Sequence, residues 1–234
     1  MLYVVTTATP RYELHELCCI LTVSELSKHL DITWIINLDV PSLLNISDEY
    51  LETCKAKLTN VPTCKTILNV NRVNPNFSRA GKWVIDACFE QFALTDDDLF
   101  FWLEDDWRIL NKYNNCNTYL NIANIIKTFT ISESLFFVMG RNYYPSGHPS
   151  IFKYDSWKKM HELYTSPSIC MEVIIFTMAK IVTGRVRQTH KSPRFPQKRF
   201  CIVMRIFVDR GRKWRDQRSI HKTKSLGTDV GWFI

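Results

Sequence analysis

The chain has 234 residues, of which 46% are hydrophobic and 13% aromatic, and its formal net charge is +7. This length suffices for one domain with a large core, and the composition excludes an intrinsically disordered chain. The eight cysteines include no Cys-x-x-Cys pair, which argues against zinc ribbons and redox motifs and favours buried free thiols in a reducing compartment. The longest apolar runs are interrupted by charge, and the chain opens on a strand pattern without signal-peptide features. We therefore expect a cytoplasmic protein without a transmembrane segment.

Strand and helix patterns alternate through the first half of the chain. In chain order we expect strand 2–7, helix 13–29, strand 32–38, helix 48–58, strand 66–70, helix 78–94, strand 99–103, helix 118–129, strand 135–139, helix 154–163, helix 169–182, strand 200–208 and helix 211–219. Such alternation predicts an α/β fold in which a mainly parallel central sheet is flanked by helices. We expect residues 1–234 to form a single domain.

The apolar strand 99–103 runs directly into three acidic residues, Glu104, Asp105 and Asp106. Adjacent carboxylates repel one another and lose hydration when buried, so a sheet edge collects them where a cation or strong donors compensate. Ligands of parallel sheets bind beyond the carboxyl ends of the strands, where Thr6 and Thr7 end the first predicted strand and Asp39 follows the second. This pattern indicates a site for a hard divalent cation that holds a phosphate, and the alternative is a polar turn.

Glycine-rich phosphate loops are missing from the sequence. The chain has seven glycines, and neither Gly-x-Gly-x-x-Gly nor Gly-Lys-Ser/Thr occurs. This absence argues against a Rossmann dehydrogenase and a P-loop NTPase. If a nucleoside diphosphate binds here, a metal ion and basic side chains must neutralise it in place of a backbone cradle.

At this point the sequence resembles the GT-A superfamily of nucleotide-sugar glycosyltransferases. Residues 4–12 (VVTTATPRY) look like the first strand and loop of such enzymes and are reminiscent of the β-1,3-glucuronyltransferases. Residues 34–39 (WIINLD) look like the second strand, and residues 104–106 (EDD) take the place of the Asp-x-Asp motif, with Glu for the first Asp. Residues 209–214 (DRGRKW) are similar to an Asp-x-Gly-Arg-x-Trp segment of small microbial and viral relatives.

The resemblance implies a metal-dependent glycosyltransferase, either a hexosyl- or a pentosyltransferase. It would move a sugar from a nucleoside-diphosphate sugar, with UDP favoured, to a hydroxyl of a sugar or glycan acceptor. Residues 1–107 would form the nucleotide-binding half, and residues 108–234 the acceptor-binding half with a basic C-terminal segment. The resemblance assigns a Mn²⁺ or Mg²⁺ ion to Asp106, with Glu104 as a second metal ligand.

The resemblance also assigns residues to the nucleotide and donor sugar. It implies that Asp105 or Glu104 contacts the ribose or the sugar, while Thr6 and Asp39 line the nucleoside site. Two basic residues at the start of helix 78–94 and one in the C-terminal segment would approach the diphosphate or sugar. These residues are Arg79, Lys82 and Arg212, with His221 as an alternative to Arg212. Each of them could instead belong to a solvated basic face.

A catalytic base is harder to assign from the residues. Glu172 lies in an otherwise apolar segment, where relatives often place an acid, although an acidic first turn of a helix is also stabilised by the helix dipole. Asp155 is the reserve candidate and resembles a helix cap. The loop 142–150, rich in Tyr, Pro and Gly, suits an acceptor sugar, and His148 within it is a minor candidate for base or metal ligand.

The main rival hypothesis is a nucleic-acid-binding protein or a Mg-dependent nuclease, based on the dense basic stretch 180–224 and the acidic cluster. The acids form one contiguous triplet, and the basic stretch lacks regularly interleaved aromatics, so nucleic acid is disfavoured as a partner. Nucleotide transfer to a sugar phosphate would normally require a glycine-rich N-terminal loop. Peripheral contact of the basic segment with an anionic membrane surface stays open, although no amphipathic anchor is evident.

Overall fold

The computed structural model describes residues 1–110, 116–132, 134, 136–139, 149–169, 171–182, 201–203 and 207–210. The strands are β1 (Leu2–Ala8), β2 (Ile32–Asp39), β3 (Lys65–Asn71), β4 (Leu99–Trp102), β5 (Trp107–Ile109), β6 (Phe136–Val138), β7 (Ser150–Lys153), β8 (Cys201–Val203) and β9 (Phe207–Asp209). The α-helices are α1 (Tyr12–His15), α2 (Leu21–Leu26), α3 (Asp48–Thr59), α4 (Phe77–Gln91), α5 (Cys116–Ile131), α6 (Tyr154–Leu163) and α7 (Met171–Val182). A π-helix, Glu16–Ile20, joins α1 to α2, and a 3₁₀ turn covers Ser42–Leu44.

Seven strands form the central sheet in the order β3-β2-β1-β4-β7-β6-β8. Strands β3, β2, β1 and β4 are parallel, β7 is antiparallel to both of its neighbours, and β6 pairs in parallel with β8. Strands β5 and β9 form a separate antiparallel pair. The predicted α/β fold with a mainly parallel sheet is confirmed.

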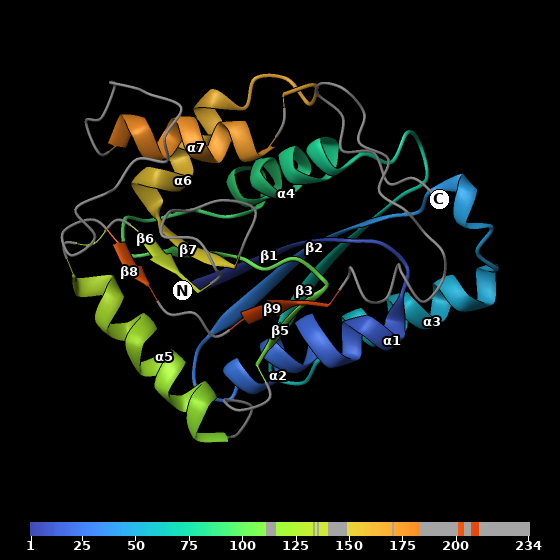
Figure 1. Ribbon diagram of the computed structural model, residues 1–234, viewed down its shortest axis with the longest axis horizontal. Helices are drawn as coiled ribbons and strands as arrows, with labels where there is room; N and C mark the ends of the chain where they lie inside the picture. Colours follow the sequence, from blue (N-terminus) through green and yellow to red (C-terminus); the bar gives the residue numbers. More distant parts are fainter. Residues whose placement is uncertain are drawn as a thin grey trace.

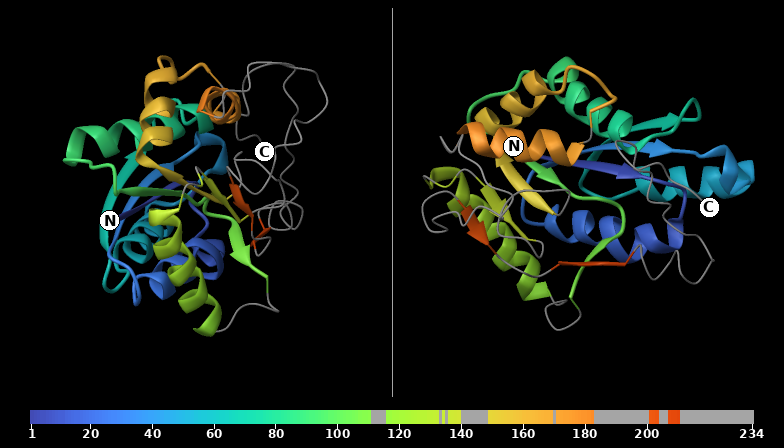
Figure 2. Two further views of the ribbon diagram at one scale, coloured as in Figure 1. Left: turned by 90° about the vertical axis from the view of Figure 1, so that its left-hand side faces the viewer. Right: turned by 45° about the horizontal axis from the view of Figure 1, so that its top comes forward.

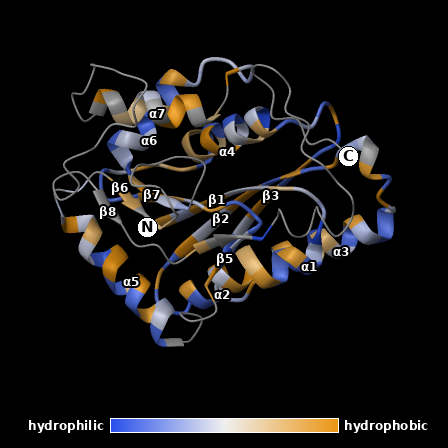
Figure 3. Ribbon diagram, in the orientation of Figure 1, coloured by the Kyte–Doolittle hydropathy of each residue, from blue (hydrophilic) through white to orange (hydrophobic). Residues whose placement is uncertain are grey.

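Helices cover both faces of this sheet. Figure 1 shows α4, α6 and α7 on one face and α1, α2, α3 and α5 on the other. The views in Figure 2 show α5 beside α2. They also show α7 next to α6 and α4. Because both faces are covered, β4 is apolar at every position, and Phe100 and Phe101 belong to the cores on opposite sides of the sheet. The apolar residues accordingly concentrate along the strands and the inner faces of the helices (Figure 3).

Two predicted elements differ from the structure. The helix predicted at 13–29 is interrupted by the π-helix and ends at Leu26. The strand predicted at 200–208 is divided, because β8 joins the central sheet whereas β9 pairs with β5. Strands β5 and β7 were not predicted, since three or four residues are too few to show a periodic pattern. The helix predicted at 211–219 lies outside the described residues.

The predicted helix 78–94 corresponds to α4, which begins one residue earlier. Its N-cap residue Asn76 accepts hydrogen bonds from the backbone N–H groups of Ser78 and Arg79, so the first turn is well capped. Among the residues that the structure describes, no helix is both long and apolar enough to cross a membrane.

Candidate active site

The strand order reverses between β1 and β4, which are neighbours in the sheet although β2 and β3 lie between them in the chain. In open α/β sheets, ligands bind beyond the carboxyl ends of the strands at such a switch point. The backbone N–H of Leu103 donates to the carbonyl of Val5 at 3.0 Å, so the acidic loop leaves β4 directly beside β1. The fold therefore brings residues 104–106 against the loop that follows β1.

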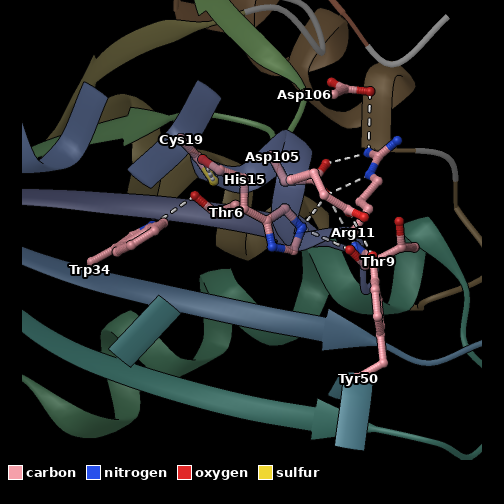
Figure 4. Close-up of polar contacts among 10 residues, drawn as sticks. Thr6, Thr9, Arg11, His15, Cys19, Trp34, Tyr50, Asp105 and Asp106 are labelled. Carbon is pink, nitrogen blue, oxygen red and sulfur yellow. Dashed lines mark hydrogen bonds and ion pairs between the residues drawn. The ribbon is translucent and has the colours of Figure 1, made fainter. Parts of the chain in front are cut away.

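Asp105 is enclosed in this loop, with a side chain only 1% exposed. Its Oδ2 accepts hydrogen bonds from the backbone N–H of Thr9 at 3.2 Å and from Nε of Arg11 at 2.9 Å, and it lies 3.1 Å from Nε2 of His15. Its Oδ1 accepts a bond from Nη2 of Arg11. Figure 4 shows these side chains converging on the carboxylate. Burial acts to raise the pKa of Asp105, but the Arg11 charge and the bonds from His15 and Arg11 hold it well below its usual range.

Arg11 connects the two aspartates of the acidic loop. Besides its two bonds to Asp105, its Nη2 lies 3.3 Å from Oδ2 of Asp106 (Figure 4). Its side chain is 1% exposed, so its charge is compensated almost entirely by protein groups. The acidic loop thus has an internal counter-ion, supplied by the loop after β1.

His15 supports the same carboxylate from the last position of α1. Its Nε2 faces two acceptors, the carbonyl of Thr9 at 2.8 Å and Oδ2 of Asp105 at 3.1 Å, so Nε2 carries the hydrogen. Its Nδ1 is buried and makes no hydrogen bond with the residues that the structure describes. The π-helix starts at the next residue, and such π segments are frequent at functional sites.

On the other face of the sheet, toward α4, amide side chains surround Asp39. Its Oδ1 accepts bonds from Nδ2 of Asn37 at 2.8 Å and from Nδ2 of Asn71 at 2.9 Å. Its Oδ2 is buried and accepts no well-formed hydrogen bond from the described part of the chain. Burial raises the pKa of Asp39, and the bonds from Asn71 and Asn37, together with a weaker approach of the backbone N–H of Asn76, oppose that rise. One carboxylate oxygen is therefore held in place and the other is left for a donor.

Three more buried polar atoms without a hydrogen-bond partner among the described residues lie on the strands of this face near the same edge: Oγ1 of Thr7, Nε1 of Trp102 and Oγ of Ser150. Trp102 and Ser150 are paired across β4 and β7, and Trp102 is level with Val5, two residues before Thr7. Together with Asp39 they form a polar row across the carboxyl ends of β2, β1 and β4 and the amino end of the antiparallel β7. Because buried polar groups in proteins almost always have partners, a row without them indicates a surface that contacts a ligand or water.

The predicted nucleoside residue Thr6 lies on the opposite face from this row. It is fully buried, and its Oγ1 accepts a hydrogen bond from Nε1 of Trp34 at 2.8 Å. Side chains alternate along a strand, so Thr7 and not Thr6 shares a face with Asp39. The alternation of side chains along β1 therefore identifies Thr7, from the sequence, as the threonine on the same face as Asp39.

The structure places the predicted basic residues at the start of α4 on its surface. Arg79 is exposed in the first turn. Lys82 donates to both oxygens of Asp86, at 2.8 and 2.6 Å, one turn farther from the carboxyl edge of the sheet. Asp86 also lies 3.4 Å from Nε2 of His161. Lys82 thus belongs to an ion pair between helices and is directed away from the polar row.

The two predicted bases are separated by the sheet topology. Strand β7 runs antiparallel to β4, so Asp155, exposed at the start of α6, follows at the edge opposite to the acidic loop. Glu172 lies in the first turn of α7, whose Met171 approaches Gly81 of α4, although its own side chain is outside the described set. Arg212, His221 and residues 142–148 of the predicted acceptor loop also lie outside the described residues.

Arg11 and His15 are the site residues for which the sequence analysis gave no role. Arg11 was noted only as part of the segment 4–12, and His15 lies four residues later on the same helical turn. Nothing local shows that both side chains converge on Asp105, which lies ninety-four residues after Arg11. Only the reversed strand order brings them together.

The acidic loop could offer carboxylate oxygens to a divalent cation. Among the residues that the structure describes, no group of three or more His, Cys, Asp or Glu side chains is placed to hold a metal ion. Glu104 is half-buried and Asp106 largely buried, and both supply the oxygen ligands that Mn²⁺ and Mg²⁺ prefer. The donor set fits a cation that takes one or two protein carboxylates and completes its coordination with phosphate oxygens and water.

No protein-family model matches the sequence, and no curated protein matches it. Among solved structures, the chain is similar to the mannosyltransferase PcManGT from Pyrobaculum calidifontis in complex with GDP-Man and Mn²⁺, with a TM-score of 0.52 and 11% identity over 94% of this chain and 61% of that one. It is also similar to residues 1–349 of TarS from S. aureus, with a TM-score of 0.51 and 11% identity over 76% and 55%. The chain spans less than two thirds of either structure. These likenesses show that the chain has a GT-A-like α/β fold.

Proposed function

We propose that the chain is a metal-dependent glycosyltransferase that moves a sugar from a nucleoside-diphosphate sugar to a hydroxyl of a sugar or glycan acceptor. The observation that carries this proposal is the meeting of the acidic loop and the polar row at the switch point of a GT-A fold. Asp106 follows β4 at this edge, and Asp39 ends β2 at the same edge with one unbonded oxygen. A nucleotide lying across β1 would reach both.

The nucleoside is assigned to Asp39 and Thr7. Two amides already occupy Oδ1 of Asp39, so the carboxylate offers one acceptor, Oδ2, to the ligand. Uracil presents a single imide N–H, which matches one acceptor. Guanine presents two adjacent donors, of which one would be left without a carboxylate oxygen. This supports a UDP-sugar as the donor, with Thr7 replacing Thr6 in the nucleoside site.

The diphosphate is assigned to the acidic loop. Asp106, assisted by Glu104, would hold a Mn²⁺ or Mg²⁺ ion whose other ligands are diphosphate oxygens and water. Bound there, the cation neutralises negative charge that develops on the nucleotide leaving group. Arg79, at the start of α4, and Arg212 remain candidates for contact with the diphosphate or sugar. Lys82 is not retained, because Asp86 binds its ammonium group.

Glu172 is retained as the proposed base that removes the proton from the acceptor hydroxyl. The first turn of α7 lies on the same face of the sheet as the polar row, because Met171 packs in the core with Trp102. Its position on the face covered by α4 and α7, the face of the polar row, supports this choice. Asp155 is not retained, since it lies at the opposite edge.

Thermal unfolding tests this proposal. The purified chain is heated with UDP, GDP or CDP, each with Mn²⁺ and with EDTA. A nucleotide at a hundred times its Kd should stabilise the folded chain by about 2.7 kcal/mol. We expect UDP to raise the Tm with Mn²⁺ and not with EDTA, and Asp106→Asn to remove the effect. A chain whose Tm responds to none of the nucleotides would overturn the proposal.

A further inference from the structure

The role of Asp105 differs from that of its neighbour Asp106. Both carboxylate oxygens of Asp105 already accept hydrogen bonds from Thr9 or Arg11, with His15 also in contact, and the side chain is 1% exposed. All three partners come from one short segment after β1. A carboxylate used in this way cannot also contact a ribose without giving up buried bonds. Asp105 therefore joins two loops of the protein and does not face a ligand.

Of the two strongly basic side chains, arginine and lysine, only that of arginine can make this set of contacts. Its planar guanidinium binds Asp105 through Nε and Nη2 together, and the same Nη2 lies 3.3 Å from Asp106. The compact ammonium group of lysine could neutralise the charge but could not reproduce the two parallel bonds. The guanidinium thus fixes the orientation of two successive carboxylates relative to each other.

The acidic loop is also held from its other side. The backbone carbonyl of Asp106 accepts a hydrogen bond from the N–H of Arg210 at 2.8 Å, and β5, which follows the loop, is paired with β9. The backbone of Asp106 is thereby fixed to the end of β9, while its side chain is held by Arg11. Both parts of Asp106 are set before any ligand arrives.

We propose that Arg11 is a positioning residue, which uses Asp105 as its anchor to hold the carboxylate of Asp106 in the orientation that meets the cation and the diphosphate. This inference rests on the proposed function. Removing a partner that orients a metal ligand typically weakens metal binding by about 10–100-fold. Arg11 itself contacts neither substrate nor cation in this account, and acts through Asp106.

Arg11→Lys tests the inference, because it keeps the charge and removes the planar fork. One measurement is the Mn²⁺ concentration that gives half of the UDP-dependent rise in Tm. The other, made without ligand, is hydrogen exchange of the backbone amides of residues 103–110. Lys159→Gln, which breaks an exposed ion pair with Glu162 on α6, is the control. If Arg11→Lys does not fold, the double variant Arg11→Gln/Asp105→Asn, which leaves no unpaired charge of this pair, replaces it.

We expect the Arg11→Lys variant to need about 10–100-fold more Mn²⁺ for half of the UDP-dependent rise in Tm. We also expect the backbone amides of residues 103–110 to exchange at least about tenfold faster than in the wild type, while the exchange rates of β2 and β3 stay unchanged. A folded variant that matches the wild type in either measurement overturns the inference, since positioning requires both changes. If the wild type binds no nucleotide, the proposed function fails. In that case hydrogen exchange alone decides whether Arg11 holds the acidic loop, and an unchanged exchange rate of amides 103–110 in the variant shows that it does not.

Discussion

Arg11 donates two parallel hydrogen bonds to the carboxylate of Asp105, although ninety-four residues separate the two in the chain. This buried pair joins the loop after β1 to the loop after β4 at the switch point of the sheet. Its position has consequences for stability and for ligand binding that separate variants can distinguish.

Asp105→Asn should destabilise the protein by about 3–5 kcal/mol at pH 7, because it removes the carboxylate that binds Arg11 through two hydrogen bonds and leaves the buried guanidinium only its 3.3 Å contact with Asp106. The folded pKa of Asp105 lies below the unfolded value of about 3.9, so the wild-type pair contributes its full stability above about pH 4 and loses it as the pH falls further. Urea unfolding between pH 7 and pH 2.5 measures both effects. We expect a shallower acid dependence for the variant, and equal acid slopes would contradict the assignment.

Thr6 and Thr7 should respond in opposite ways to the same change. Thr6→Val leaves Nε1 of Trp34 buried without its acceptor and should cost about 1–3 kcal/mol of stability, with UDP affinity retained in the folded fraction. Thr7→Val should leave stability nearly unchanged, because Oγ1 of Thr7 has no partner in the described structure, and should weaken UDP binding. Denaturant unfolding and calorimetry of the two variants provide the comparison. The reverse pattern would return the nucleoside site to Thr6.

Asp39→Asn should separate stability from binding. Burial raises the pKa of this carboxyl group, so ionised Asp39 stabilises the fold less than a neutral side chain would. The amide keeps one oxygen for Asn37 and Asn71 and replaces the ligand acceptor by an N–H donor. We expect unchanged or higher stability at pH 7 and at least about a tenfold loss of UDP affinity, equivalent to about 1.4 kcal/mol. Unchanged affinity would remove Asp39 from the nucleoside site.

Gly81→Ala should stabilise the protein by about 0.5–1 kcal/mol, because glycine is costly inside a helix. A Cβ at this position of α4 would lie 3.5 Å from Cγ and Sδ of Met171 and 3.5 Å from Cη2 of Trp102, which are ordinary van der Waals distances. The Tm of the variant measures the effect. A fall in Tm would show that α7 packs more tightly on α4 than these distances indicate.

Glu172→Gln should abolish sugar transfer and retain UDP binding, since it removes a proton acceptor without removing a nucleotide contact. Product formation from a UDP-sugar and calorimetric UDP affinity are the two readouts. Glu162→Gln, an exposed position on α6, serves as the matched control. Retained turnover in Glu172→Gln would remove this residue from the mechanism, and loss of turnover in Asp155→Asn would restore Asp155.

Much of the fold was predictable because its signals are local. The alternating apolar segments of β1 and β2 and the apolar run of β4 identified the parallel core of the sheet, and the three acids after β4 marked its carboxyl edge. Strand β5 and its pairing with β9 were not predictable in the same way. Each strand has three residues, and the pairing joins positions about a hundred residues apart, for which no local pattern exists.

The site was predicted less completely than the fold. The sequence identified the acidic triplet but not the separate tasks of its members, because Asp105 acquires its partners only when the loops after β1 and β4 meet. It assigned Lys82 to the ligand, whereas an acid one turn along α4 binds its ammonium group. Charge patterns therefore identified a candidate site, whereas side-chain contacts show which of its charged groups are bound by other groups of the protein.

The central claim is a cation-dependent nucleotide site at Asp106. Calorimetric titration of UDP into the chain, with Mn²⁺ and with EDTA, tests it most directly when wild type and Asp106→Asn are compared. We predict that Mn²⁺ strengthens UDP binding to the wild type and has no effect on the variant, whose Tm without ligand stays close to that of the wild type. Equal UDP affinity with Mn²⁺ and with EDTA in the wild type would contradict the account.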